Sequence, residues 1–89
     1  MERMTLEVLS KLVAEDTECF NGSENTAENR EKVKKLVDSI LSVLKMRRHI
    51  HTFAVQCNES NNPPSEERII YNVMVELKRG VPNYFRVRC

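Results

Sequence analysis

Apolar residues in the first half of the chain recur at helical spacing. Over residues 4–14 one apolar face alternates with polar positions, which predicts a short amphipathic helix. Its apolar positions are Met4, Val8, Leu9, Leu12 and Val13. Residues 15–25 break this period, and the run Asn21-Gly22-Ser23 is typical of a turn. Because a helix this short is marginal by itself, we expect it to pack against the rest of the chain.

A longer apolar stripe with a period near 3.6 residues predicts a second helix over residues 26–44. The stripe consists of Val33, Leu36, Val37, Ile40, Leu41, Val43 and Leu44. Asn25 followed by Glu28 has the spacing of a capping box, so Asn25 is the predicted N-cap. Basic residues then follow at the end of the stripe, where the negative end of the helix dipole favours cations.

Beyond Arg48 the period changes to two, which predicts three strands. The residues predicted to face one side are His51, Phe53, Val55 and Cys57 in the first strand, Ile69, Tyr71, Val73, Val75 and Leu77 in the second, and Phe85, Val87 and Cys89 in the third. Residues 58–67 contain asparagines and prolines, which predicts an exposed loop whose asparagines bond backbone near the end of the strand. Residues 78–82 are the predicted connector, and the last strand is expected over 83–89.

The order of two helices and three strands predicts an α+β fold, with one helix packed on one face of a small antiparallel three-stranded sheet. Residues 1–24 are expected to form an N-terminal helix and linker, and residues 25–89 the helix-plus-sheet unit, within a single domain overall. The expected core sets Leu36, Ile40 and Leu44 against Phe53, Val55, Tyr71, Val73 and Val75. Such a sheet has two open edges, and an open edge is a template for a strand of another chain.

Composition and charge narrow the classes of protein. The chain has 89 residues, of which 40% are hydrophobic and 30% charged, which fits one folded domain. With 14 basic and 13 acidic residues, its net charge of +1 argues against holding nucleic acid mainly by charge. No long apolar run is present, so we expect no membrane span and no signal peptide. Three scattered cysteines are typical of a reducing cytoplasm.

Candidates for catalysis or metal binding are weak. His49, His51 and Cys57 share a predicted strand face, but His51 and Cys57 are roughly 20 Å apart at about 3.3 Å per residue. The chain has no zinc-ligand spacing, no nucleophile elbow and no glycine-rich phosphate loop. We therefore expect no enzymatic activity, no metal and no cofactor.

A basic cluster supports an alternative function. It consists of Lys45-Met46-Arg47-Arg48-His49 together with Arg86 and Arg88, and such residues are able to contact phosphate. They are equally expected at a helix end, where they offset the dipole, and on a solvated strand face. A small nucleic-acid-binding or dimerisation adaptor that uses this basic helix end therefore remains the alternative.

The second half of the chain resembles a known family. It carries Phe53-Ala54-Val55-Gln56-Cys57-Asn58-Glu59-Ser60-Asn61-Asn62-Pro63-Pro64, then an alternating strand, a proline-containing connector and the run Tyr84-Phe85-Arg86-Val87. Preceded by an amphipathic helix, this order resembles the C-terminal domain of contractile-tail sheath proteins of phages and related injection machines. Asn58 stands where that family usually has aspartate, and sheath subunits are several times longer. A small sheath-like baseplate or sheath-initiating protein fits the length better.

This resemblance implies a structural protein of the virion tail, assembled in the host cytoplasm, whose partners are other tail or baseplate subunits. In that family, terminal arms add strands to a neighbour's C-terminal domain. The implied subunit interface is the final strand, with residues Tyr84, Phe85, Arg86, Val87, Arg88 and Cys89. The implied motif turn contains Cys57, Asn58, Asn61 and Asn62. The sequence leaves open whether the last strand pairs within its own chain or with a neighbour.

Overall fold

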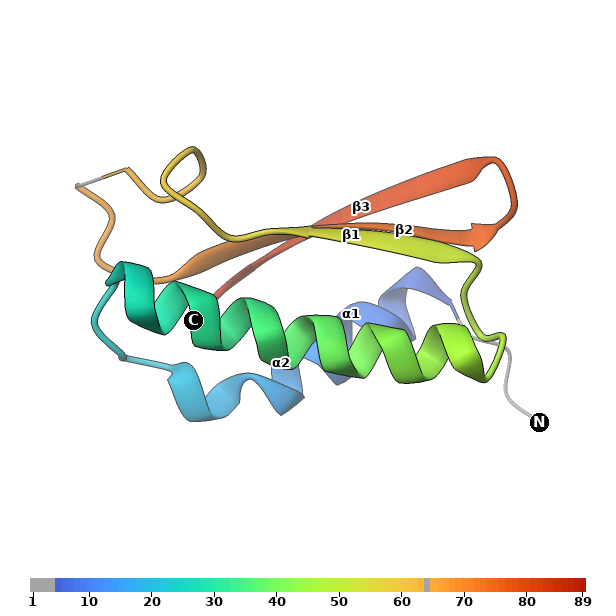
Figure 1. Ribbon diagram of the computed structural model, residues 1–89, viewed down its shortest axis with the longest axis horizontal. Coiled ribbons are helices and arrows are strands. Elements are labelled where there is room, and N and C mark those ends of the chain that lie inside the picture. The colour runs from blue at the N-terminus through green and yellow to red at the C-terminus, as the bar shows by residue number, and fades with distance from the viewer. Residues whose placement is uncertain (1–4, 64) are drawn as a thin grey trace.

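Two α-helices lie on one face of a three-stranded antiparallel sheet in the computed structural model, which describes residues 5–63 and 65–89 (Figure 1). The elements are α1 (Leu6–Asp16), the short 3-10 helix η1 (Glu18–Phe20), α2 (Ala27–Met46), β1 (Thr52–Gln56), β2 (Ile70–Lys78) and β3 (Val81–Arg88). The strands lie in the order β1-β2-β3, as in a simple meander. The predicted α+β class and the predicted order of elements are confirmed.

Threonine hydroxyls cap both helices. At α1, Thr5 Oγ1 accepts a hydrogen bond of 3.2 Å from the Val8 N–H, so the helix begins at Leu6. The predicted apolar position Met4 lies outside the described residues. At α2, Thr26 Oγ1 accepts a bond of 3.1 Å from the N–H three residues on, and the helix begins one residue later. The prediction that Asn25 caps this helix was therefore wrong.

The β2–β3 connection is tighter than the sequence predicted. β2 continues to Lys78 and β3 already begins at Val81, so only Arg79 and Gly80 form the turn. Gly80 has φ +81°, a conformation that glycine adopts without the cost of a side chain. Pro82, which was assigned to the connector, instead lies in an edge strand, where a missing N–H is tolerated.

Both helices cover the sheet, where the sequence predicted one. α2 contacts β1 and α1 contacts β3, so the two helices share the inner face (Figure 1). Tyr71 of β2 is fully buried, and its hydroxyl forms a hydrogen bond of 2.9 Å with Thr17 Oγ1 at the end of α1. Because Thr17 is itself buried and Leu9 and Val13 lie in the core cluster, α1 is part of the same core as α2 and the sheet.

The residues of α2 that are fully buried are not those predicted. Val33, Val37 and Leu41, spaced four apart, are fully buried, whereas Ile40 and Leu44 only flank the core and Leu36 lies half-buried outside the core cluster. On the sheet side Tyr71, Val73 and Val75 are buried as predicted, and Phe53 and Val55 are half-buried against them. The apolar stripe of α2 is wide, so its periodicity alone does not show which row of its residues faces the sheet.

Candidate functional site

The final strand, which the resemblance implied as a subunit interface, pairs with its own chain. β3 lies antiparallel to β2, with Val73 opposite Phe85 and Tyr71 opposite Val87. Phe85 and Val87 pack on the core, and Cys89 is buried. The structure thus answers the question left open by the sequence. Within this chain the apolar side of the last strand is already covered by the helices, and a truncation of residues 84–89 would remove part of the core.

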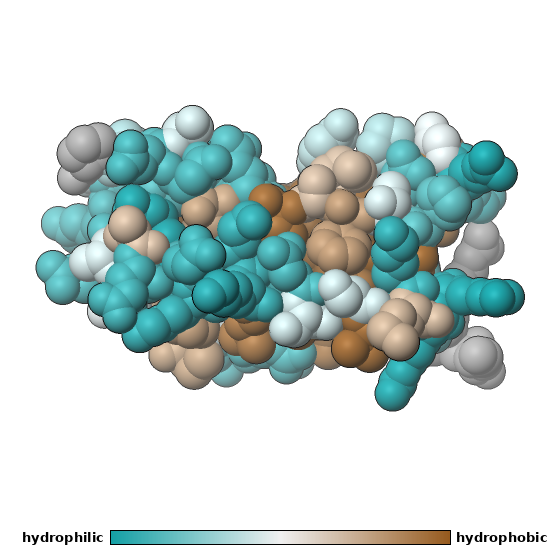
Figure 2. Space-filling model, in the orientation of Figure 1, coloured by the Kyte–Doolittle hydropathy of each residue, from teal (hydrophilic) through white to brown (hydrophobic). Residues whose placement is uncertain are grey.

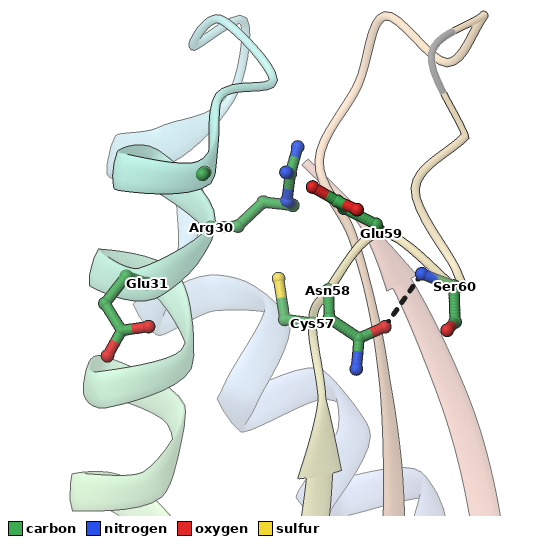
Figure 3. A pocket seen from close by; sticks show the side chains of 7 residues that line it. Arg30, Glu31, Cys57, Asn58, Glu59 and Ser60 are labelled. Atoms are coloured by element: carbon green, nitrogen blue, oxygen red, sulfur yellow. Dashed lines mark hydrogen bonds between the residues drawn. The ribbon is translucent and has the colours of Figure 1, made fainter.

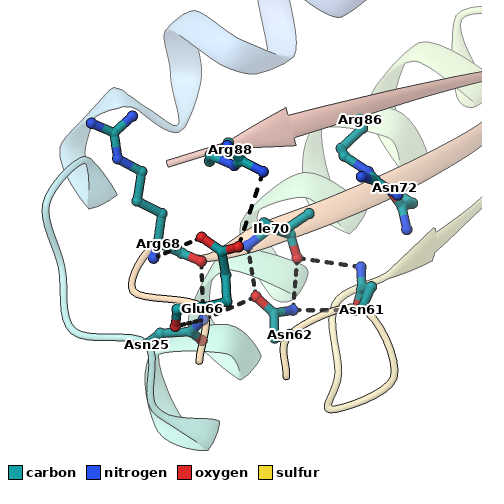
Figure 4. A network of polar contacts seen from close by, with 9 residues as sticks. All are labelled: Asn25, Asn61, Asn62, Glu66, Arg68, Ile70, Asn72, Arg86 and Arg88. Carbon is teal, nitrogen blue, oxygen red and sulfur yellow. Dashed lines mark hydrogen bonds and ion pairs between the residues drawn. The ribbon is translucent and has the colours of Figure 1, made fainter. Parts of the chain in front are cut away.

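What β3 leaves uncovered is its outer side and its outer edge. Tyr84, Arg86 and Arg88 are exposed and point away from the helices. Tyr84 is 70% exposed and lies in a cross-strand row with Met74 and Ala54. Arg86 Nε donates to Asn72 Oδ1 at 3.0 Å, which holds the arginine against the sheet (Figure 4). This face carries no helix, as Figure 1 shows.

The hydrogen bonds at the end of the sheet show which backbone groups face outward. Ile70 bonds through both its N–H and its C=O to Asn62, on the β1 side, while the Cys89 N–H donates to the Ile69 carbonyl, on the β3 side. Backbone groups alternate in direction along a strand, and directly opposed residues share bonds. In this register, the backbone N–H and C=O groups of three β3 residues point away from β2. These residues are Tyr84, Arg86 and Arg88.

The same alternation identifies the free edge of β1. Gln56 lies opposite Asn72 and Ala54 opposite Met74. The backbone N–H and C=O groups of these even-numbered β1 residues point toward β2. The backbone groups of Phe53 and Val55 therefore point to the outer edge of β1. Among the described residues the sheet holds three strands, so β1 and β3 each present one edge without a strand beside it.

The loop after β1 is held by its asparagines. The Asn62 side chain accepts from the Ile70 N–H at 2.7 Å and donates to the Ile70 carbonyl at 2.8 Å, as a neighbouring strand would (Figure 4). Asn61 Nδ2 donates to the Gln56 carbonyl at 2.8 Å. Asparagine bonds to backbone near the strand end are thus present. The expectation that the whole loop is exposed was wrong, because Asn62 is only 4% exposed.

Asn25 connects this loop to the start of α2. Its amide nitrogen donates to Asn62 Oδ1 at 3.1 Å and to the Glu66 and Arg68 carbonyls (Figure 4). Its own oxygen accepts from Arg30 at 2.9 Å. This role of Asn25 was not predicted from the sequence. The available signal was Thr26, a second good capping residue directly after Asn25, which leaves the Asn25 side chain available for another partner.

A cleft of about 370 Å³ lies between the first turns of α2 and the end of β1. Cys57, Asn58, Glu59 and Ser60 line one wall, and Arg30 with Glu31 the other (Figure 3). Burial raises the pKa of the Cys57 thiol to about 11, and the Arg30 charge only partly offsets that. Burial therefore favours the neutral thiol of Cys57, which is less nucleophilic than a thiolate.

His49 and His51 do not form a site with Cys57. His51 lies at the opposite end of β1 and lines a separate cleft. Within residues 5–63 and 65–89, no group of three or more histidine, cysteine, aspartate or glutamate side chains is placed to hold a metal ion. No helix in the described part of the chain is long and apolar enough to cross a membrane.

No protein-family model matches this chain, and neither a curated protein nor a solved structure does. The features of this protein that bear on its function are therefore the sheet edges, the outer face of the sheet and the loop.

Proposed function

We propose that this chain is a structural assembly protein of a contractile tail, which joins subunits by accepting their β-strands at the open edges of its sheet. The observation that carries this proposal is the pair of free edges on a sheet whose inner face is already filled by two helices. Strand addition needs an ordered edge of this kind. The resemblance of residues 53–64 and the following strands to the sheath C-terminal domain supports the setting, a virion tail assembled in the host cytoplasm.

Strand addition binds mainly through the backbone. Each added hydrogen bond contributes about 0.5–1.5 kcal/mol net, so one short strand binds modestly, and repeated copies around a ring strengthen the assembly. At the β3 edge, the exposed Tyr84 and Arg86 would contact outward-facing side chains of the added strand. At the β1 edge, the inward-facing side chains of the added strand would cover the half-buried Phe53 and Val55.

The β1 side also has apolar surface for such a strand. Figure 2 shows hydrophobic surface gathered in the region where α2 and β1 run one above the other, with hydrophilic surface on either side. An added strand would remove part of this surface from water, which stabilises the complex by about 25 cal/mol for each Å² of apolar surface buried. Tail and baseplate subunits are the proposed partners.

A matched pair of variants tests the β3 edge. The Arg86 N–H points outward, so Arg86→Pro removes an edge donor without breaking a bond to β2, whereas Arg86→Ala keeps the donor and removes the same side chain. We expect tagged Arg86→Ala chains to enter particles and Arg86→Pro chains to be depleted, as measured by imaging and by mass spectrometry of purified particles. Val55→Pro and Val55→Ala make the same comparison at β1.

The outcomes separate the possibilities. Depletion of only the β1 or only the β3 proline variant identifies the edge that accepts the strand. If both proline variants enter particles as well as their alanine partners, strand addition is wrong. If no particle contains the wild-type chain, the assignment to a contractile tail is wrong. Circular dichroism of the purified variants checks that each remains folded.

A further inference from the structure

A second cleft lies where α2 ends and the β2–β3 hairpin turns. It has a volume of about 450 Å³, which is within the range of ligand sites. Its lining residues are Lys45, Arg48, Ile50, His51, Leu77 and Arg79. Three of these side chains are cationic, His51 adds a further polar ring, and no acidic residue is among them. Arg79 comes from the hairpin turn, far along the chain from the helix end.

Arg48 adopts a backbone conformation that rarely suits its residue type. Its φ is +62°, and within residues 5–63 and 65–89 it is the one non-glycine residue with positive φ. The Arg48 N–H donates to the Lys45 carbonyl and the His49 N–H to the Leu44 carbonyl, both at 2.9–3.0 Å. This is the Schellman pattern of a helix end, in which glycine is the usual residue because it has no Cβ. The chain therefore keeps an arginine where glycine would be less strained.

Compensation of the helix dipole does not account for this cleft. It explains cations in the last turn of α2, but not Arg79, which belongs to another element. The ion pairs among the described residues join Lys32 to Glu28, Lys34 to Asp38 and Arg88 to Glu66, so none of them uses a cation of the cleft. The nearby Glu76 directs its carboxylate to the Gly80 N–H.

We propose that this cleft binds a phosphate group. A phosphate carries more than one negative charge as a monoester and offers several acceptor oxygens. These oxygens suit the guanidinium groups of Arg48 and Arg79 and the ammonium of Lys45, which come from two segments of the chain. A single carboxylate would leave most of that charge unmatched. The phosphate belongs either to a small compound or to the backbone of a nucleic acid. The positive charge is concentrated in this cleft, which is compatible with a net charge of only +1 for the whole chain.

The strained arginine supplies the test. Arg48→Gly removes the side chain and relieves the backbone, so we expect a higher melting temperature together with affinity for pyrophosphate about three- to tenfold weaker, measured by isothermal titration at low salt. Arg47→Ala, which removes an adjacent exposed arginine outside the cleft, is the matched control and should change affinity less than about twofold. Arg79→Ala should weaken binding as Arg48→Gly does.

Further probes identify the source of the phosphate. A labelled single-stranded DNA that binds more tightly than pyrophosphate, and loses affinity with the same two variants, indicates a nucleic-acid backbone. Pyrophosphate binding without DNA binding indicates a small phosphate compound. Equal binding of poly-glutamate, equal losses in Arg47→Ala and Arg48→Gly, or no binding of any probe would overturn the proposal. None of these results depends on strand addition, since Arg86 and Val55 lie outside the cleft.

Discussion

Asn62 shows how one side chain can take the place of a strand. Its amide bonds both backbone groups of Ile70, where the ladder between β1 and β2 would otherwise end with buried groups unpaired. It also accepts from Asn25 and donates to the Asn58 carbonyl, so it ties the loop to the start of α2 as well. Buried polar groups that lose a partner cost more than the bond itself contributes.

Asn62→Ala should therefore lower the free energy of unfolding by about 2–4 kcal/mol, because it leaves the buried Ile70 N–H without a partner and the Ile70 carbonyl with only the 3.3 Å bond from Asn61 Nδ2. The control is Asn58→Ala in the same loop. The Asn58 side chain is exposed and bonds only close neighbours, so its loss should cost less than about 1 kcal/mol. Urea unfolding of both variants measures the difference. Equal losses would mean that Asn62 does not hold the loop.

Among the elements, α2 is the one whose existence the sequence predicted most firmly. The sequence did not predict the rotation of α2 about its own axis. The stripe from Val33 to Leu44 predicted a long helix, and the helix runs to Met46. A stripe that broad fits several rotations about the helix axis. Packing in the folded core selects one of these rotations, in which Val33, Val37 and Leu41 are the fully buried residues.

Leu41→Ala and Leu36→Ala test this orientation. Leu41 is fully buried in the core cluster, so its truncation should cost about 2–5 kcal/mol, including the cavity that it leaves. Leu36 is half-buried and outside the cluster, so the same substitution should cost about 1 kcal/mol. Thermal and urea unfolding report both values. A larger loss for Leu36→Ala would mean that α2 is rotated from the orientation described.

At the level of the whole molecule, the core contains three titratable side chains, those of Cys57, Tyr71 and Cys89. Burial raises the pKa of Cys57 to about 11 from 9.0, and it raises the pKa values of Tyr71 and Cys89 as well. An acid whose pKa is higher in the folded state holds its proton there after the unfolded chain has lost it. The folded protein then binds more protons than the unfolded chain, so stability falls as pH rises.

The free energy of unfolding should accordingly be unaffected by Cys57 below about pH 9 and decline between about pH 9 and 11. In Cys57→Ala, which lacks that thiol, the decline over the same interval should be shallower, with the remainder due to Tyr71 and Cys89. Urea unfolding at a series of pH values measures both slopes. Identical slopes in the variant and the wild type would show that Cys57 ionises no differently in the two states.

The sequence by itself determined the secondary structure and its order. Helical and alternating periods are local properties, and they placed two helices, three strands and the inward residues Tyr71, Val73 and Val75 correctly. It also indicated that the asparagines after β1 bond backbone. The class of partner came from the resemblance and remains a proposal, since local pattern carries no information about other chains.

Only the tertiary structure decided which residues meet across long separations. It paired the last strand with β2, placed α1 beside α2 on the same face, buried Asn62 and bonded it to Asn25, and brought Arg79 to the end of α2. Each of these depends on contacts between residues far apart in the chain, where the competing arrangements satisfy the same local periodicity. The difference between them is set by packing and by the pairing of buried polar groups, which exist only once the chain is folded.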